Sequence, residues 1–248
     1  ASLGVVTEEK PHAVTIDVCG VNVAKQMHVG HLRSTVIGDT VARLFERLGR
    51  TVHRQNHLGD WGLPIAMTLH SLISRGTDLD ALDLDALNTA YRDAQLEARG
   101  DARGLAAAND RHCGPHRLAE LETQEASARD AQAAARDALV RLQSGDPAMV
   151  AAWKRLIEVT MVEVYRATSL LNTRITPESE RGESSFRKEL AGVVDDFVER
   201  GLAVEDDGAL VVRFEDRERP MLVRKRDGGF LYATTDLAAL RYRVQDLD

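Results

Sequence analysis

The first sixty residues change hydrophobic pattern twice. Apolar and polar side chains alternate over 13–18, where several residues are β-branched, and this predicts a strand. Over 32–48 the apolar residues recur at helical spacing, and 51–56 again has the composition of a strand. A strand, a helix and a strand in this order predict half of a parallel α/β sheet, which binds nucleotides at the carboxyl ends of its strands.

A mostly helical pattern begins near residue 76. Good helix formers dominate 88–143. Breaks at Gly100, Gly104 and the Gly114-Pro115 pair predict about three helices there.

Two other segments of this region are less uniform. The doubled Asp-Leu-Asp-Ala-Leu sequence of 78–87 either begins a capped helix or forms an acidic linker, and the linker is slightly favoured. Residues 151–171 predict a further helix, in which Met161 is expected to be a core residue.

Short strands return after residue 200. Asp207-Gly208 separates two strand-like runs within 203–212 and predicts a hairpin, and a second hairpin is expected over 222–231. Residues 234–245 then become helical. These patterns predict the first half of an α/β domain, a mostly helical insertion that ends in a hairpin, and a return to the first domain, over 1–75, 76–217 and 218–248.

Length and cysteine content exclude several classes of protein. A chain of 248 residues can bury one substantial core, with room for a small second subdomain. No apolar run approaches the ~20 residues that a membrane helix needs, and the first residues have no signal-peptide pattern. Two distant cysteines, Cys19 and Cys113, argue against a disulfide framework or a zinc site and favour a reducing cytoplasm.

The net charge of −7 argues against tight nucleic-acid binding by the chain as a whole, because Lys and Arg supply most of the affinity for phosphate. A local basic patch remains compatible with this charge. The densest basic stretch, 217–226, is either such a patch or the solvated face of a hairpin, and the sequence favours neither.

Candidate chemistry lies where the first predicted strand gives way to the first helix. His28, Gly30 and His31 fall on this turn, where unpaired backbone N–H groups and the helix dipole favour an anion. A glycine there lets a flat group approach the backbone closely. The pattern predicts a phosphate, and hence a nucleotide, at the helix start. The alternative is a chance tetrapeptide whose histidine only caps the helix.

His28-Val29-Gly30-His31 resembles the first signature of class I aminoacyl-tRNA synthetases. The longer run from Asn22 to Asp39 resembles arginyl-tRNA synthetases specifically, and 54–62 and 227–239 resemble further segments of that family in the same order. The resemblance implies a Rossmann-type class I synthetase nucleotide-binding fold of the α/β class, with a mostly helical insertion.

The resemblance also implies an ATP site. His28 and His31 would contact the phosphates and stabilise the transition state as pyrophosphate leaves, which is an electrostatic role. Lys25, in the same loop, would pair with a phosphate and assist activation. Gly30 would lie against the nucleotide, and Mg²⁺ would enter with ATP rather than through a site of the chain's own.

An arginine site is implied by four further residues. Asn22 matches a residue that holds the amino or carboxylate end of arginine, and Asp17 matches an acidic residue near the substrate. Tyr232 and Asp236 match the pair that grips the guanidinium, which suits an aromatic face and a bidentate carboxylate. In an unrelated protein, Asp236 would be read as a charge stabilising the start of a helix.

Several features depart from the family's pattern. Gly20-Val21 replaces Ser-Pro, Leu63-Pro64-Ile65-Ala66 replaces Thr-Gln-Phe-Gly, and Phe186 replaces a tyrosine. The family's N-terminal tRNA-contacting domain, its second signature loop and its anticodon-binding domain are expected to be missing. A homodimer, or a partner chain that completes the sheet, is therefore one hypothesis.

Three functions remain open at this point. The first, which is favoured, is ATP-dependent activation of arginine to arginyl-adenylate for transfer to tRNA, by a cytoplasmic ligase without membrane contact. The second is a stand-alone paralogue that activates or binds arginine, or an analogue, without tRNA. The third is a non-catalytic arginine-binding or partner-binding module.

Overall fold

The computed structural model describes residue 4 and residues 11–247. The chain forms two compact units, and each is described by itself. The first unit comprises Ala1–Val21, Val29–Gly59 and Thr168–Asp248, and the second comprises Asn22–His28 and Asp60–Ala167. These units are defined by contacts, so the predicted division into domains over 1–75, 76–217 and 218–248 stays a prediction.

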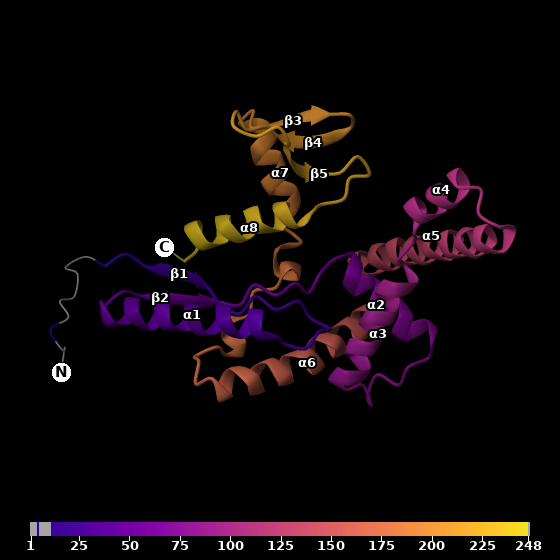
Figure 1. The fold of residues 1–248 in the computed structure, drawn as a ribbon. Helices are drawn as coiled ribbons and strands as arrows, with labels where there is room; N and C mark the ends of the chain where they lie inside the picture. Colours follow the sequence, from indigo (N-terminus) through magenta and orange to yellow (C-terminus); the bar gives the residue numbers. More distant parts are fainter. Residues whose placement is uncertain (1–3, 5–10, 248) are drawn as a thin grey trace. The chain divides into compact units, whose positions relative to one another are not determined.

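The first unit begins with a strand–helix–strand element (Figure 1). Strand β1 (Val14–Asp17) pairs in parallel with β2 (Val52–Gln55), and helix α1 (Val29–Arg47) connects them. This confirms the predicted half of a parallel sheet. The helix starts three residues before the periodic pattern does, because its first turn carries Gly30 and His31 in place of apolar residues.

Two adjacent residues of α1 make its contacts with the two strands. A Cβ atom on Gly38 would lie 2.8 Å from Cγ1 of Val18, so only glycine allows this closeness to the end of β1. The neighbouring Asp39 is buried and accepts hydrogen bonds from Nε of Arg43 and Nε of Arg54, at 2.7 and 3.0 Å. Because Arg54 lies on β2, this carboxylate ties the helix to the second strand.

The remainder of the first unit is an antiparallel sheet packed against helices. Strands β3 (Ala203–Asp206), β4 (Ala209–Val212) and β5 (Met221–Arg224) follow α7 (Leu190–Glu199) and precede α8 (Tyr232–Gln245), and the 3₁₀ helices η1 (Pro177–Ser179) and η2 (Glu183–Phe186) lie before α7. Apolar residues of α7, α8, η2 and the sheet form the core here.

The predicted hairpins are present in this sheet. Asp207 and Gly208 have φ angles of 50° and 78° between the paired residues Asp206 and Ala209, as a two-residue type I′ turn requires. The second hairpin is closed by a bridge between Arg224 and Phe230.

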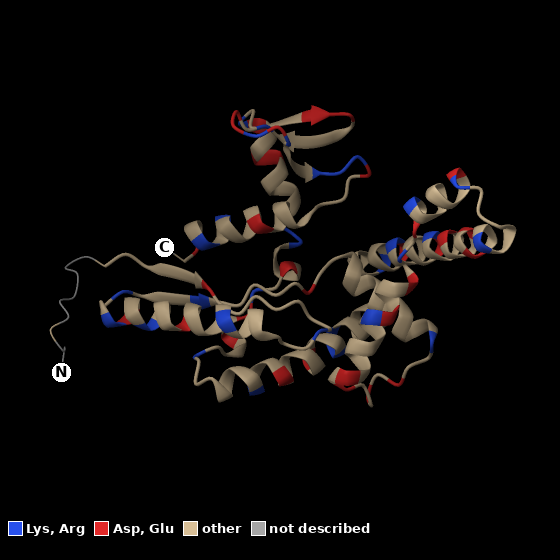
Figure 2. Cartoon of the chain, in the orientation of Figure 1, with Lys and Arg blue, Asp and Glu red and all other residues tan. Residues whose placement is uncertain are grey.

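The basic residues of the stretch 217–226 lie on exposed positions before, within and after β5 (Figure 2). Arg226 pairs with Asp207 in the neighbouring turn. These positions favour the interpretation of a solvated hairpin face.

The second unit is helical. It contains α2 (Leu63–Ser74), α3 (Leu84–Glu97), α4 (Ala102–Asp110), α5 (Pro115–Ser144) and most of α6 (Pro147–Leu170). The three helices expected over 88–143 are thus confirmed as α3, α4 and α5. Met161 is 4% exposed, as expected of a core residue.

Two sequence predictions fail in this unit for the same physical reason. Gly104 does not break a helix, because it lies in the first turn of α4 and its N–H donates to the carboxylate of Asp101. The favoured linker over 78–87 is wrong for its second half, where Asp83 caps α3 by accepting a hydrogen bond from the N–H of Ala86. In both places an aspartate satisfies an unpaired amide of a first turn.

The core of the second unit is built on α2, α3, α5 and α6. Fully buried leucines and a methionine form its centre. Trp61 packs edge-on against Trp153, whose Nε1 donates to the carbonyl of Asp60 at 2.8 Å. Asp60 and Trp61 therefore have structural roles in this core. Across the described residues, no helix is both long and apolar enough to cross a membrane.

Candidate functional site

The predicted site residues are divided between the two units. Asp17, Gly30, His31, Tyr232 and Asp236 belong to the first unit, and Asn22, Lys25 and His28 belong to the second. The signature run therefore passes from one unit to the other between His28 and Val29.

The turn after β1 is strained and held by side chains. Cys19 and Gly20 have φ angles of 69° and 64°, and the N–H of Gly20 donates to Oδ1 of Asn56 at 3.0 Å. The hydroxyl of Ser34 lies 3.2 Å from the carbonyl oxygen of Cys19 and 2.9 Å from that of His31. These contacts fix the first turn of α1 next to the carboxyl end of β1. Burial raises the pKa of the Cys19 thiol, which therefore stays protonated at neutral pH.

Two predicted arginine-binding carboxylates, far apart in the sequence, lie beside one histidine. The backbone N–H of His57 is 3.5 Å from Oδ1 of Asp17, and its ring Nε2 is 3.6 Å from Oδ1 of Asp236. His57 lies two residues beyond the end of β2, so all three residues lie near the carboxyl edge of the parallel strands. Its position after a strand was the available signal, yet the sequence analysis gave His57 no role.

The two carboxylates differ in their present partners. Nη2 of Arg243 donates to Oδ2 of Asp17 at 2.9 Å, and Nε of Arg243 donates to Gln55, so a guanidinium of the chain already occupies Asp17. The Asp236 side chain is 61% exposed, and among the described residues its one ion-pair contact is the longer one to His57. Asp236 is therefore the better placed of the two to receive an external cation.

Tyr232 and Asp236 share one face of α8. The helix begins at Tyr232, so these two residues are separated by four helical positions and project from the same side. Tyr232 is 72% exposed. The structure thus brings Asp236 near Asp17 through His57 and leaves the ring of Tyr232 open to solvent.

In the second unit, the loop that carries Asn22, Lys25 and His28 is anchored at its centre. Val23 and Ala24 are fully buried, and the N–H of Ala24 donates to Oγ1 of Thr160 at 3.0 Å. Asn22 and His28 are exposed on either side of this anchor.

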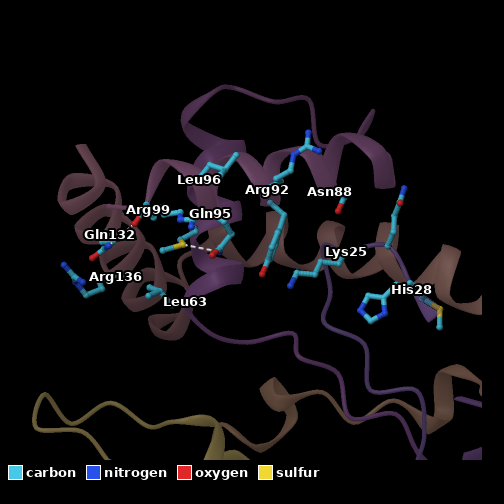
Figure 3. Close-up of a pocket in the computed structure, with 15 residues that line it drawn as sticks. Lys25, His28, Leu63, Asn88, Arg92, Gln95, Leu96, Arg99, Gln132 and Arg136 are labelled. Atoms are coloured by element: carbon cyan, nitrogen blue, oxygen red, sulfur yellow. Dashed lines mark hydrogen bonds between the residues drawn. The ribbon is translucent and has the colours of Figure 1, made fainter. Parts of the chain in front are cut away.

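Lys25 is positioned by an aromatic ring. Its Nζ lies 4.5 Å from the ring centroid of Tyr91 on α3, a cation–π contact. Lys25 and His28 also line a cavity of about 900 Å³ together with residues of α2, α3 and α5 (Figure 3). The sequence analysis missed this cavity, because its residues are dispersed over helices and form no motif.

Among the described residues, no group of three or more His, Cys, Asp or Glu side chains could hold a metal ion.

Comparisons with known proteins agree with this geometry. The family model described as tRNA synthetases class I (R), catalytic domain, matches residues 2–248. The arginine–tRNA ligase of Cutibacterium acnes is 41% identical over 245 residues, which cover 98% of this chain and 39% of the relative. That of Haemophilus influenzae is 40% identical over 253 residues, or 99% and 39% of the two chains.

A solved structure shows the same architecture. The arginyl-tRNA synthetase of Plasmodium falciparum superposes with a TM-score of 0.69 at 26% sequence identity, covering 97% of this chain and 36% of its own. The chain thus spans about two fifths of the length of the curated relatives that it matches. With a family model that matches nearly every residue, the chain belongs to the class I tRNA synthetases for arginine, within their catalytic domain.

Proposed function

We propose that this chain carries the ATP- and arginine-binding part of an arginine–tRNA ligase active site. In the reaction, a carboxylate oxygen of arginine attacks the α-phosphorus of ATP. The new oxygen–phosphorus bond forms as the bond to the pyrophosphate oxygen breaks, and pyrophosphate leaves with the electron pair. The arginyl group then passes to a terminal hydroxyl of tRNA, and AMP leaves.

The ATP phosphates would be bound by Lys25, His28 and His31, with Gly30 allowing the nucleotide to approach the backbone. Gly30 and His31 lie in the first turn of a 19-residue helix, whose unpaired amides and dipole favour negative charge. Histidine and lysine donors would stabilise the charge that develops as pyrophosphate leaves. Mg²⁺ would accompany ATP and neutralise part of its charge.

Arginine would be bound through both of its charged ends. Asp236 would accept the guanidinium and the ring of Tyr232 would stack on it, while Asp17 and Asn22 would face the rest of the amino acid. The observation that carries this proposal is the meeting of Asp17 and Asp236 beside His57, because it brings two carboxylates, of which Asp236 is largely exposed, to the carboxyl edge of β1 and β2.

The test is arginine-dependent ATP–pyrophosphate exchange by the purified chain, with and without tRNA. We expect His28→Ala to abolish the exchange, and His116→Ala, at another exposed histidine of the second unit, to leave it unchanged. Exchange without tRNA would favour the stand-alone activating enzyme. Exchange that requires tRNA would support the complete ligase reaction.

Arginine binding is tested separately by calorimetry, so that it does not depend on turnover. Asp236→Asn removes the carboxylate, and we expect it to weaken arginine binding by at least tenfold, about 1.4 kcal/mol. Asp195→Asn, which removes an exposed carboxylate of α7, is the matched control. Equal affinities for the two variants, or exchange that persists in His28→Ala, would refute the assignment. The same proposal includes three further points. The arginyl group is transferred to tRNA, two copies of the chain associate, and the protein is located in the cytoplasm.

A further inference from the structure

His57 lies beside the proposed arginine site without a role in it. Its side chain is 15% exposed, and neither ring nitrogen has a hydrogen-bond partner among the described residues. A buried polar atom without a partner destabilises a fold, and native proteins contain few of them. An apolar side chain of similar size would fill the same place without this cost, so folding alone does not account for a histidine here.

The imidazole ring packs against an aromatic neighbour. Its centroid lies 6.0 Å from that of Phe186, with 32° between the two ring planes. Phe186 is 2% exposed and packs in turn against Tyr242, with 6.0 Å between their centroids. Because Phe186 has no hydroxyl group, it restricts the position of the imidazole without offering it a hydrogen bond. A partner for the imidazole must therefore lie on another side of the ring.

The backbone before His57 is fixed on both sides. The N–H of Asn56 donates to the carbonyl of Ser179 at 2.7 Å, and the carbonyl of Asn56 accepts from the N–H of Arg181 at 3.0 Å. Asn56 is fully buried, and its Oδ1 accepts from the N–H of Gly20. Since both the backbone and the ring are constrained, the imidazole presents its nitrogens at defined positions.

One of these nitrogens faces the carboxylate of Asp236. Nε2 of His57 is 3.6 Å from Oδ1 of Asp236, slightly beyond the usual hydrogen-bond distance of about 2.7–3.2 Å. Hydrogen bonds of active sites are often long in the unliganded enzyme and shorten when the substrate binds. The Asp236 side chain is 61% exposed and lies in the first turn of α8, so a rotation of this side chain can close the gap.

The other carboxylate at this edge does not compete for the ring. Asp17 accepts a hydrogen bond from Arg243, and its contact with His57 is to the backbone N–H rather than to the imidazole. A carboxylate has about four acceptor positions. Asp236 can therefore accept a hydrogen bond from the imidazole and still accept two parallel N–H groups of a guanidinium.

We propose that His57 is a positioning residue of the arginine site. Its Nε2–H donates to the carboxylate of Asp236 and holds this exposed side chain in the orientation that accepts both N–H groups of a guanidinium. Because both ring nitrogens are buried, arginine would contact Asp236 and not the imidazole. This inference rests on the proposed function, since it assigns His57 a part in binding the same amino acid.

The test is a double-mutant cycle on arginine affinity, measured by calorimetry with the full chain. His57→Leu removes the donor and keeps an apolar group against Phe186. We expect this variant to bind arginine about fivefold more weakly or worse, the effect of one hydrogen bond to a charged group. In an Asp236→Asn chain we expect the same substitution to change the affinity by less than about twofold, because a residue that acts through Asp236 loses its effect once the carboxylate is gone.

Three further measurements separate orientation from packing. His57→Gln places an amide nitrogen as many bonds from Cα as Nε2, so we expect it to restore most of the affinity. His53→Leu, at a partly buried histidine of β2, is the matched control and should leave the affinity unchanged. In urea unfolding, we expect the midpoint of His57→Leu to equal or exceed that of the native chain, because two buried polar atoms without partners are removed.

The outcomes distinguish this inference from the proposed function. A native chain that does not bind arginine would overturn both. If the native chain binds arginine and Asp236→Asn weakens the binding, but the losses from the two single variants add in the double variant, His57 does not act through Asp236 and this inference alone fails. A lower urea midpoint for His57→Leu, with no recovery of affinity in His57→Gln, would show a packing role and would likewise overturn it.

A second experiment needs neither arginine nor the double variant. Nitrogen-15 NMR of the histidine rings reports which ring nitrogen carries the proton, and the signals that are absent from His57→Gln identify His57. At about pH 8, the upper end of the range in which histidines change charge, we expect the proton on Nε2. We also expect Asp236→Asn, but not Asp195→Asn, to shift these signals. A proton on Nδ1 alone would leave no donor toward Asp236 and would overturn the proposal.

Discussion

Asp39→Asn is the substitution that most directly tests what holds α1 against the parallel strands. In the native chain the Asp39 side chain is 4% exposed and accepts hydrogen bonds from Arg43, Arg54 and the backbone N–H of Arg174. The Arg54 side chain is 9% exposed, and its remaining carboxylate partner is Glu46. Asparagine keeps one acceptor oxygen but removes the charge and places N–H donors near two guanidinium groups.

The expected cost follows from the burial of Arg54. Removing one partner of a buried ion pair costs about 3–5 kcal/mol, because the other charge stays buried. Nη2 of Arg54 is itself buried without a hydrogen-bond partner, so this side chain has no spare contact to compensate. Since asparagine retains one acceptor, we expect about 3 kcal/mol, or a fall in Tm of about 6–12 °C.

The assay combines urea unfolding by circular dichroism with hydrogen exchange of peptides from α1 and β2. Both tryptophans lie in the second unit, so their fluorescence reports whether that unit is unaffected. The control is Asp196→Asn on α7, where Arg200 donates to Asp196 at 2.8 Å with the same i,i+4 geometry but in solvent. An exposed pair contributes less than about 1 kcal/mol. Losses for the two variants that agree within about 0.5 kcal/mol would refute the argument from burial.

Three other outcomes are expected. Gly38→Ala should destabilise the chain by about 1–2 kcal/mol in urea, because the clash with Val18 exceeds the gain in helix propensity; a neutral result would contradict the tight contact. Asp83→Ala should cost about 1 kcal/mol and speed hydrogen exchange in the first turn of α3, and unchanged exchange would exclude the cap. Arg54 lowers the pKa of Glu46, and for Asp39 the hydrogen bonds outweigh burial and lower the pKa as well. The stabilisation from these two carboxylates is therefore present above their ordinary pKa values of 3.8 and 4.5, and it is lost as the pH falls through their lower pKa values in the folded chain. The urea concentration at the unfolding midpoint should therefore decrease when the pH is below about 4, and it should decrease less in Asp39→Asn.

Local patterns were enough to predict many elements of this fold, although α2 and α7 were not among those predicted. The alternation before residue 18, the helical spacing after residue 32 and the Asp207-Gly208 turn each depend on neighbours in the sequence, and all three predictions are confirmed. The failures at Gly104 and over 78–87 are also local. There, composition predicted a break or a linker, whereas an aspartate three residues before an amide closed a first helical turn.

The candidate site is only partly accessible to this reasoning. The start of α1 could be predicted, because a strand and a helix flank it. The meeting of Asp17, His57 and Asp236 could not, because it depends on α8 packing back against the end of β1. Three arginines that line the cavity of the second unit are likewise dispersed: Arg92 lies on α3, Arg99 between α3 and α4, and Arg136 on α5. No spacing rule connects these positions in the sequence.

Gly38 and Asp39 show why a signature and a site are not the same set of residues. Both belong to the run that resembles arginyl-tRNA synthetases, yet neither lies in the first turn of α1. Gly38 lets the helix approach Val18, and Asp39 binds Arg54 of β2, so their effect is to fix the helix on the sheet. Because Gly30 and His31 lie in the first turn of the same helix, their position relative to β1 depends on these contacts of Gly38 and Asp39. A substitution at Asp39 should therefore weaken ligand binding at a turn that it does not touch.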